Sequence, residues 1–396
     1  MKQAIKVLYF FPHPIVNRNH GNVTRAIQLL EYFISRNMDV DFVTAEHDEI
    51  EDEQGSLQQM FPEINAFFLG RKGAKDNYFK YFFNAKIPSI IDRKRQEKYH
   101  RYIASEISHF AKQQFNNLLK KKKYDVIIIS YVYSAALIRD NPYVGNARLV
   151  IDTHDFMTAQ CKHNKKFQLG ASFEEEINII KQFHESWSIS SDELYVFSQF
   201  VPTVKHCFVP VMFKNNVADI DKGSVNFDLI YISSINPHNQ AAAKWFFSHV
   251  YPLLSKSIRI CVIGGITNFI PPDLPNVTSI PFAKDLKEYY HQSRIAICPM
   301  LEGTGIKVKV VEALSFGLPV VCTLRGLDGL PQKKDNGCLL AGTEAEFANG
   351  IIRLISDDLF YEKKRKEGIE MFEKYFLESS IYEELDTIFN QHTPAQ

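Results

Sequence analysis

Residues 299–330 read PMLEGTGIKVKVVEALSFGLPVVCTLRGLDGL, and this stretch decides the fold. It follows a short apolar run at 295–298 (IAIC) that is typical of a buried strand. After a turn containing two glycines, residues 307–316 have the apolar spacing of a helix, and 319–322 (PVVC) form the next strand. Strand, helix and strand in this order predict a parallel βαβ unit.

The same alternation extends over the whole chain. In the first half, apolar runs predict strands at 5–10, 39–44, 65–69, 125–130, 148–152 and 194–197. In the second half, they predict strands at 228–233, 258–263, 276–280, 295–298 and 319–322, with helices at 239–255, 285–292, 307–316, 343–355 and 358–390. We therefore expect an α/β protein with two Rossmann-like, doubly wound domains.

We expect the first domain to cover 1–206 and the second 207–375, because a polar stretch follows CFVPV near residue 207. No G-x-G-x-x-G motif follows the first strand of either half, which disfavours a dinucleotide-dependent oxidoreductase. The six cysteines are scattered without a C-x-x-C pair, and no apolar run is long enough for a membrane span. The N-terminus does not resemble a signal peptide, so we expect a cytoplasmic protein.

The charges balance over the chain at 46 basic and 46 acidic residues, but their distribution is uneven. Residues 71–123 hold fifteen Lys or Arg against four acids, with aromatic residues between them. Two interpretations stay open, a pair of solvated helices or a surface that rests on anionic lipid at the inner face of the membrane. No nucleic-acid-binding motif accompanies the segment, so we expect no nucleic-acid partner.

The glycine turn and the following helix have the composition of a phosphate site. Gly303 and Gly305 let the backbone approach a ligand closely, and Lys307 and Lys309 open the helix, whose N-terminal amides favour an anion. Glu312 lies further along the same helix, where a carboxylate can accept hydrogen bonds from ribose hydroxyls. These residues together indicate a nucleotide site.

The stretch resembles the donor-binding signature of GT-B glycosyltransferases, especially retaining enzymes of family 4 (glycosyl transferases group 1). The motifs that carry the resemblance are G-T-G-I-K-V-K-V-V-E-A, G-L-P-V-V and G-L-D-G-L, with N-Q-A-A-A-K-W-F at 239–246 and F-A-K-D-L-K-E-Y-Y at 282–290. The resemblance is specific over 228–330. It implies two domains facing each other across a cleft, with a C-terminal helix at 376–396 that packs back on the first domain.

The resemblance also implies roles for individual residues. Lys307 would neutralise the leaving diphosphate, helped by Lys309 or by backbone amides, and Glu312 would hold the ribose. The remaining donor contacts it implies are Gly303, Thr304, Gly305, Ile306, Ser234, Asn239, Phe282 and Gly21. One departure is that Thr304 stands where the family has its first paired glutamate, and Glu302 lies two residues too early.

In the first half, I-D-T-H-D-F at 151–156 ends a predicted strand and resembles the family's T-x-H or D-x-H-D motif. His154 would then act on the reacting sugar, and either Asp152 or Asp155 would orient its ring; we count His154, Asp155 and Lys307 as the catalytic candidates. The loop before the first helix adds further candidates for acceptor or phosphate contacts, namely His13, Arg18 and His20. No compelling D-x-D metal clamp appears in the predicted cleft, and we expect neither a metal nor a cofactor.

The sequence thus favours a glycosyltransferase that uses a nucleotide-diphosphate sugar as its donor and a glycan or a lipid-linked molecule as its acceptor, in surface polysaccharide or glycoconjugate synthesis. The resemblance to family 4 favours retention of configuration. Two other functions stay open, a GT-B UDP-sugar 2-epimerase and a non-catalytic GT-B scaffold subunit. The donor nucleotide, the sugar and the linkage are not encoded in any motif that we recognise.

Overall fold

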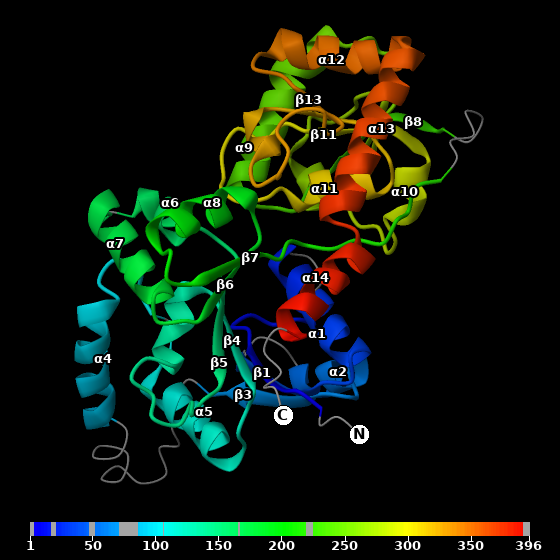
Figure 1. The fold of residues 1–396 in the computed structure, drawn as a ribbon. Helices are drawn as coiled ribbons and strands as arrows, with labels where there is room; N and C mark the ends of the chain where they lie inside the picture. The colour runs from blue at the N-terminus through cyan, green and yellow to red at the C-terminus, as the bar shows by residue number, and fades with distance from the viewer. Residues whose placement is uncertain are drawn as a thin grey trace. The chain divides into compact units, whose positions relative to one another are not determined.

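The computed structural model of the protein consists of two compact α/β units, the first formed by Met1–Ile189 with Glu193–Val209 and the second by Ser190–Asp192 with Pro210–Gln396 (Figure 1). The residues that the structure describes are 4–16, 21–46, 52–70, 86–105, 107–164, 167–218 and 225–390. No helix in these ranges has the length and apolar character that crossing a lipid bilayer requires.

The first unit contains, within its described residues, a seven-stranded parallel sheet in the order β3-β2-β1-β4-β5-β6-β7. The strands are β1 (Lys6–Phe10), β2 (Asp39–Ala45), β3 (Asn65–Leu69), β4 (Val126–Ser130), β5 (Arg148–Asp152), β6 (Glu185–Ser188) and β7 (Lys205–Phe208). The helices are α1 (Gly21–Ser35), α2 (Glu53–Met60), α4 (Ile87–Tyr99), α5 (His109–Lys121), α6 (Met157–Gln160), α7 (Leu169–Ile180) and α8 (Ser191–Phe200).

Helices cover both faces of this sheet, with α1 and α2 on one side and α7 on the other (Figure 1). This explains the continuous apolar runs, because a strand packed on both faces has no side chain that reaches water. Every residue of β4 (VIIIS) is buried. The core therefore lies on both sides of the sheet.

The second unit has a six-stranded parallel sheet within the described part of the chain, in the order β10-β9-β8-β11-β12-β13. The strands are β8 (Phe227–Ile232), β9 (Ile260–Ile263), β10 (Val277–Ile280), β11 (Ser293–Cys298), β12 (Val320–Cys322) and β13 (Cys338–Leu340). The helices are α9 (Pro237–Trp245), α10 (Lys287–His291), α11 (Val308–Ser315), α12 (Glu344–Ser356), α13 (Asp358–Tyr375) and α14 (Glu378–Asn390). The aromatic residues Phe246, Phe247 and Phe347 lie in its core.

The strand order reverses once in each sheet, beside β1 and β4 in the first unit and beside β8 and β11 in the second. At such a switch point, the loops that follow the two central strands run in opposite directions and leave room for a ligand at the carboxyl edge. The predicted site residues follow these strands: Ser234 comes after β8, and residues 303–307 come after β11.

The strand predicted at 194–197 is wrong, because these residues lie in α8 and the strand at this place in the sheet is β6. The sequence of β6, ESWS, is polar although all four residues are buried. Glu185 can be buried there because Arg148 and Lys205 each approach its Oε1 to 3.4 Å. Apolar periodicity gives no signal for such a strand.

The continuous helix predicted at 358–390 is also wrong, because it is divided into α13 and α14. Phe213, which lies far away in sequence, forms a β-bridge with Leu377 at the break. Its amide donates to Phe376 O at 2.9 Å, and its carbonyl accepts from Glu378 N at 2.9 Å. A long-range backbone pairing therefore interrupts a segment whose local sequence favours a helix.

The close approach of α13 to β13 predicts a position where alanine is not tolerated. Gly337 has φ 78°, and a Cβ there would lie 2.4 Å from the Cα of Gly368. We expect Gly337→Ala to lower the free energy of unfolding by about 2–4 kcal/mol, from left-handed strain and the backbone clash. Gly342→Ala is the control, since its Cβ would meet only the Glu346 carboxylate at 3.3 Å. Equal stability of the two variants in urea titrations would contradict this reading.

Candidate functional site

The loop between β11 and α11 offers unused hydrogen-bond donors. Gly303 (φ 98°) and Gly305 (φ 71°) adopt left-handed conformations that glycine alone takes without strain. Within the described residues, the amide N–H groups of 303–306 have no acceptor. The Oγ1 atom of Thr304 between them is buried and also has no partner there. Converging amides and a hydroxyl of this kind suit a ligand that is rich in anionic oxygens.

Lys307 closes this loop at the N-cap position of α11 and is almost completely buried. Its Nζ donates to Gly305 O at 2.7 Å and to Thr304 O at 3.2 Å, and it lies 3.8 Å from Oδ2 of Asp328. The loop therefore folds around the ammonium group. The positive charge sits at the N-terminus of a helix, where the helix dipole already favours a negative ligand.

Lys309 joins the two sides of the switch point in the second unit. Its Nζ donates to Ser233 Oγ at 2.7 Å and to Asn239 Oδ1 at 3.2 Å. Asn239 in turn donates from Nδ2 to Ser234 O at 2.9 Å. Burial lowers the pKa of Lys309, and the charge of Lys307 acts in the same direction. The predicted residues Ser234, Asn239 and Lys309 thus belong to one hydrogen-bond network.

Glu312 lies on the second turn of α11. Its Oε2 accepts a hydrogen bond from the hydroxyl of Tyr290 at 3.1 Å. Burial raises the pKa of this carboxyl to about 7, although the bond from Tyr290 acts to lower it. The tyrosine was not among the residues predicted from the sequence, because nothing in F-A-K-D-L-K-E-Y-Y shows where its side chain points.

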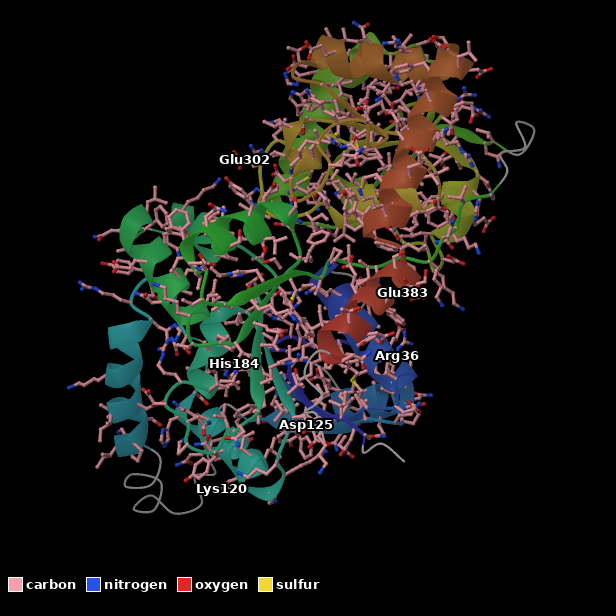
Figure 2. The ribbon with its side chains drawn as sticks, in the orientation of Figure 1. Arg36, Lys120, Asp125, His184, Glu302 and Glu383 are labelled. Atoms are coloured by element: carbon pink, nitrogen blue, oxygen red, sulfur yellow. The ribbon has the colours of Figure 1, made fainter. Side chains whose placement is uncertain are left out.

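Three further residues that the sequence analysis considered for the nucleotide-sugar site lie in the second unit. Phe282, after β10, exposes 76% of its surface. Glu302 lies at the surface of the unit (Figure 2), where its Oε2 is 3.5 Å from Nδ1 of His238. Ile306 is buried beneath the loop. Glu302 therefore contacts His238 at the surface, and neither of its two possible roles is tested by this contact.

In the first unit, the strand β5 ends at a buried ion pair. Asp152 Oδ2 lies 2.7 Å from Nε2 of His154, and its Oδ1 lies 2.5 Å from a guanidinium nitrogen of Arg25 on α1. All three side chains are fully buried. Burial favours the neutral acid, but Arg25 and His154 outweigh it and hold the pKa of Asp152 well below its usual range.

The ionised Asp152 fixes the histidine tautomer. A carboxylate accepts only, so Nε2 of His154 carries the proton and donates. Nδ1 is buried without a partner among the described residues, and it is an acceptor when the imidazole is neutral. The backbone of His154 is left-handed (φ 57°), and its ring stacks on Tyr131 at 4.6 Å between centroids. The site thus presents one unpaired acceptor nitrogen, held in place by packing and by an ion pair.

The sequence left Asp152 and Asp155 as equal candidates to orient His154, and the structure shows that Asp152 contacts the ring. Asp155 accepts a hydrogen bond from Gln160 at 2.9 Å, and its catalytic role stays a prediction. The loop that follows is anchored by Glu176, which accepts from the amides of Met157 and Thr158 at 2.8 Å each. Burial raises the pKa of Glu176 to about 7.

The other candidates of the first unit lie on the loop before α1. His13 contacts the Tyr133 hydroxyl at 3.0 Å, and Gly21 is the first residue of α1. Arg18 and His20 lie outside the described residues, as do 71–85 of the basic segment. Sequence reasoning missed Arg25 and Tyr131; the only signal was the charge of Arg25 among the apolar residues of the first predicted helix.

The comparisons with known proteins agree with this geometry. Residues 226–357 match the model of the family described as glycosyl transferases group 1. An uncharacterized 44.6 kDa protein in the cps region of Klebsiella pneumoniae is 25% identical over 89% of this chain and 90% of its own length. An uncharacterized glycosyltransferase of Haemophilus influenzae is 32% identical over 27% of this chain and 31% of its own length.

Among solved structures, the Anabaena HepE protein, determined in complex with UDP, superposes with a TM-score of 0.68 at 13% identity, covering 98% of this chain and 100% of that one. This similarity confirms the predicted GT-B fold. The chain has the GT-B fold, and its residues 226–357 match the model of the glycosyl transferases group 1, which supports a glycosyltransferase. The predicted specific stretch, 228–330, lies within the matched residues.

The buried pairs of the glycosyltransferase predict its response to substitution. Asp152→Asn leaves the Arg25 guanidinium buried without a counter-charge, so we expect the free energy of unfolding to fall by about 3–5 kcal/mol. Asp155→Asn, at a half-buried position, should change it by at most about 0.5 kcal/mol. Urea titrations of both variants measure the difference.

The pH dependence supplies a second check. Folding lowers the pKa of Asp152, so its ionised form stabilises the folded protein. This contribution to the free energy of unfolding is complete above the unfolded pKa of about 4 and is lost as the pH falls below it. The difference in the free energy of unfolding between the wild type and Asp152→Asn should therefore be constant from pH 8 to 5 and become smaller below about pH 4. A difference that disappears at pH 7 would rule out the ionised pair.

Proposed function

We propose that this glycosyltransferase takes a sugar from a nucleotide-diphosphate donor, with retention of configuration, and delivers it to a glycan or lipid-linked acceptor in surface polysaccharide synthesis. The observation that carries the proposal is the loop 303–307, in which amides without an acceptor among the described residues precede a buried lysine at the start of a helix. A diphosphate matches this loop because it presents several anionic oxygens to donors that are already in place.

Lys307 would act on the leaving group. Negative charge grows on the diphosphate as its bond to the anomeric carbon breaks, and a fixed ammonium in a water-poor site stabilises that charge. In the free protein, Lys307 donates to neutral carbonyl oxygens, which a phosphate oxygen would outcompete. Lys309, which donates hydrogen bonds to Ser233 and Asn239, would hold the N-terminus of α11 and its amides in position.

Glu312 would bind the ribose hydroxyls of the nucleotide, for which it must be ionised. His154 would act on the reacting sugar, with Nδ1 accepting a hydrogen bond from a sugar hydroxyl. Retention of configuration requires no proton-accepting base from the protein, so we assign His154 to orientation of the sugar rather than to proton removal. The tautomer that Asp152 imposes supports this assignment.

Two relatives support the substrate classes. HepE has been solved with UDP and with UDP-glucose, which makes uridine nucleotides the first donors to test. The Klebsiella pneumoniae relative is described as a protein of the cps region, which supports a role in polysaccharide synthesis. The direct test is a panel of UDP-, GDP- and CMP-sugars, in which acceptor-dependent release of nucleotide is measured. Release that needs no acceptor and yields an altered donor sugar would instead indicate an epimerase.

We expect three substitutions to separate the roles kinetically. Lys307→Ala should lower kcat by about 10²–10³-fold, because its charge is used most in the transition state. Glu312→Gln should mainly raise the KM of the donor, since ribose contacts are alike in ground and transition states. His154→Ala should lower kcat and leave the affinity for nucleoside diphosphate nearly unchanged.

The matched control is Lys366→Ala on α13, whose side chain is 78% exposed, and it should behave as the wild type. Calorimetric titration of UDP into each variant separates binding from turnover. The assignment is wrong if His154→Ala weakens UDP binding as much as Lys307→Ala does, or if it retains full turnover.

We further propose that the basic segment meets an anionic membrane surface, where a lipid-linked acceptor would be found. Lys122 is committed to Asp39 and Asp41 at 2.8 Å each, which leaves Lys120, Lys121 and Lys123 exposed at the end of α5. On α4, Ile90 and Ile91 expose 41% and 50% of their surfaces. Exposed cations with apolar side chains suit an anionic interface.

Co-sedimentation with phosphatidylglycerol vesicles tests this proposal. Changing Lys120, Lys121 and Lys123 to Ser should weaken binding by about 100-fold, since each lysine near the surface contributes about 1 kcal/mol. Changing Lys363, Lys366 and Lys374 on α13 to Ser removes the same charge elsewhere and should leave binding unchanged. Equal binding of the two triple variants would refute the proposal.

A further inference from the structure

We propose that Tyr290 is a positioning residue for the donor nucleotide: its hydroxyl fixes Oε2 of Glu312 and leaves Oε1 for the ribose hydroxyls. This inference rests on the proposed function of Glu312. Neither the family match nor the sequence motifs assign a role to the tyrosine hydroxyl. Tyr290 and the residues that it contacts all lie within the second unit.

The tyrosine lies along one face of α11. Its ring stacks on Phe316 with centroids 4.5 Å apart and planes 14° apart, and its hydroxyl reaches Glu312. Glu312 and Phe316 are four residues apart, so they lie one above the other on the same helix face. The stack with Phe316 therefore sets where the hydroxyl can be, and the hydroxyl sets where the carboxylate can be.

The other carboxylate oxygen is available. Among the described residues, Oε1 of Glu312 has no hydrogen-bond partner. Side chains on a helix lean toward its N-terminus, which in α11 is the end that carries the loop 303–307. A carboxylate held at one oxygen loses less conformational freedom when a ligand binds to the other, so the tyrosine prepares the site for ribose.

The hydroxyl also controls the charge of the carboxylate. Burial raises the pKa of Glu312 to about 7, and the bond from Tyr290 opposes this rise. Ribose hydroxyls donate hydrogen bonds to the ionised form of Glu312. The preference for ribose over deoxyribose should therefore appear as the pH rises through about 7. Without the tyrosine hydroxyl, the pKa of Glu312 would be higher, and the preference would appear only at higher pH.

The other titratable groups around α11 have different partners. On its own helix, Lys309 donates to Ser233 and Asn239, and Lys307 donates to the loop carbonyls. On the elements packed against it, Arg365 of α13 donates to Ala218 O, and His291 of α10 packs on Phe316. Cys298 of β11 and Cys322 of β12 are buried, and burial contributes to raising the pKa of each thiol.

The test compares ribose with deoxyribose. UDP, GDP and ADP are titrated into the wild type, and the tightest of them is paired with its 2′-deoxy form at pH 6 to 9. The ratio of the two dissociation constants reports the ribose contact, because the phosphates titrate alike in both ligands. For the wild type, we expect a ratio near one at pH 6 that rises to about tenfold above pH 7, since a hydrogen bond to a charged group is lost in the deoxy form.

Tyr290→Phe should move the midpoint of this rise upward by about one pH unit, which is the effect of losing one hydrogen bond to a charged group. Tyr289→Phe, the same change one residue earlier, should leave the midpoint where it is. Phe316→Leu lowers stability by removing the stack but keeps the hydroxyl, so it separates lost packing from the lost hydrogen bond. Its midpoint should lie between those of the wild type and Tyr290→Phe, because the hydroxyl is still present but is no longer held in place by the stack.

The proposed roles of Tyr290 and of Glu312 can fail separately. If the wild type prefers the ribonucleotide and Tyr290→Phe has the same midpoint, the role of Tyr290 is refuted and that of Glu312 survives. If the wild type binds a nucleoside diphosphate without any preference for ribose at any pH, the role of Glu312 fails and the inference falls with it. If none of the three nucleotides binds, the proposed donor class is wrong.

Discussion

The hydrogen bonds of Lys309 are the interaction on which the proposed nucleotide-sugar site of the second unit depends. The sheet order of the second unit reverses between β8 and β11, and a single buried ammonium joins the loop after β8, through Ser233 and Asn239, to the helix after β11. Burial of a cation is costly unless polar partners surround it. Because Ser233 lies in the loop after β8 and Asn239 lies in α9, the bonds of one ammonium group hold both of these positions against the N-terminal part of α11.

The first unit also has a buried charge, which lies beside the candidate residue His154. Arg25 belongs to α1 and Asp152 to β5, and their buried pair positions His154 from below while Tyr131 stacks on its ring. Both His154 and Tyr131 have left-handed backbones (φ 57° and 65°). Strained conformations at non-glycine residues persist only where surrounding contacts hold them, and such positions concentrate at functional sites. Each unit therefore uses a buried charge to hold its site residues in place.

Most of the fold could be predicted from the sequence because parallel strands covered on both faces contain continuous apolar runs, as at 126–129 in β4 and 295–298 in β11. The prediction failed where a long-range contact outweighed the local pattern: Glu185 is buried in β6 by ion pairs, and Phe213 divides the last predicted helix at Leu377. The donor-site candidates of the loop 303–307 and of Glu312 follow one another along the chain, so the sequence alone places them together; their roles stay predictions. Arg25, Tyr131 and Tyr290 could not, since each reaches its partner across more than 20 positions.

The measurement that tests the central claim most directly is a crystal structure of the protein with bound nucleoside diphosphate. The account predicts that the terminal phosphate lies within hydrogen-bond distance of the amides of 303–306, with Nζ of Lys307 turned from the loop carbonyls to a phosphate oxygen. It also predicts that the ribose hydroxyls contact Glu312 while Lys309 keeps its bonds to Ser233 and Asn239. A nucleotide bound with its phosphates away from this loop, or with Lys307 still donating to Thr304 and Gly305, would contradict the account.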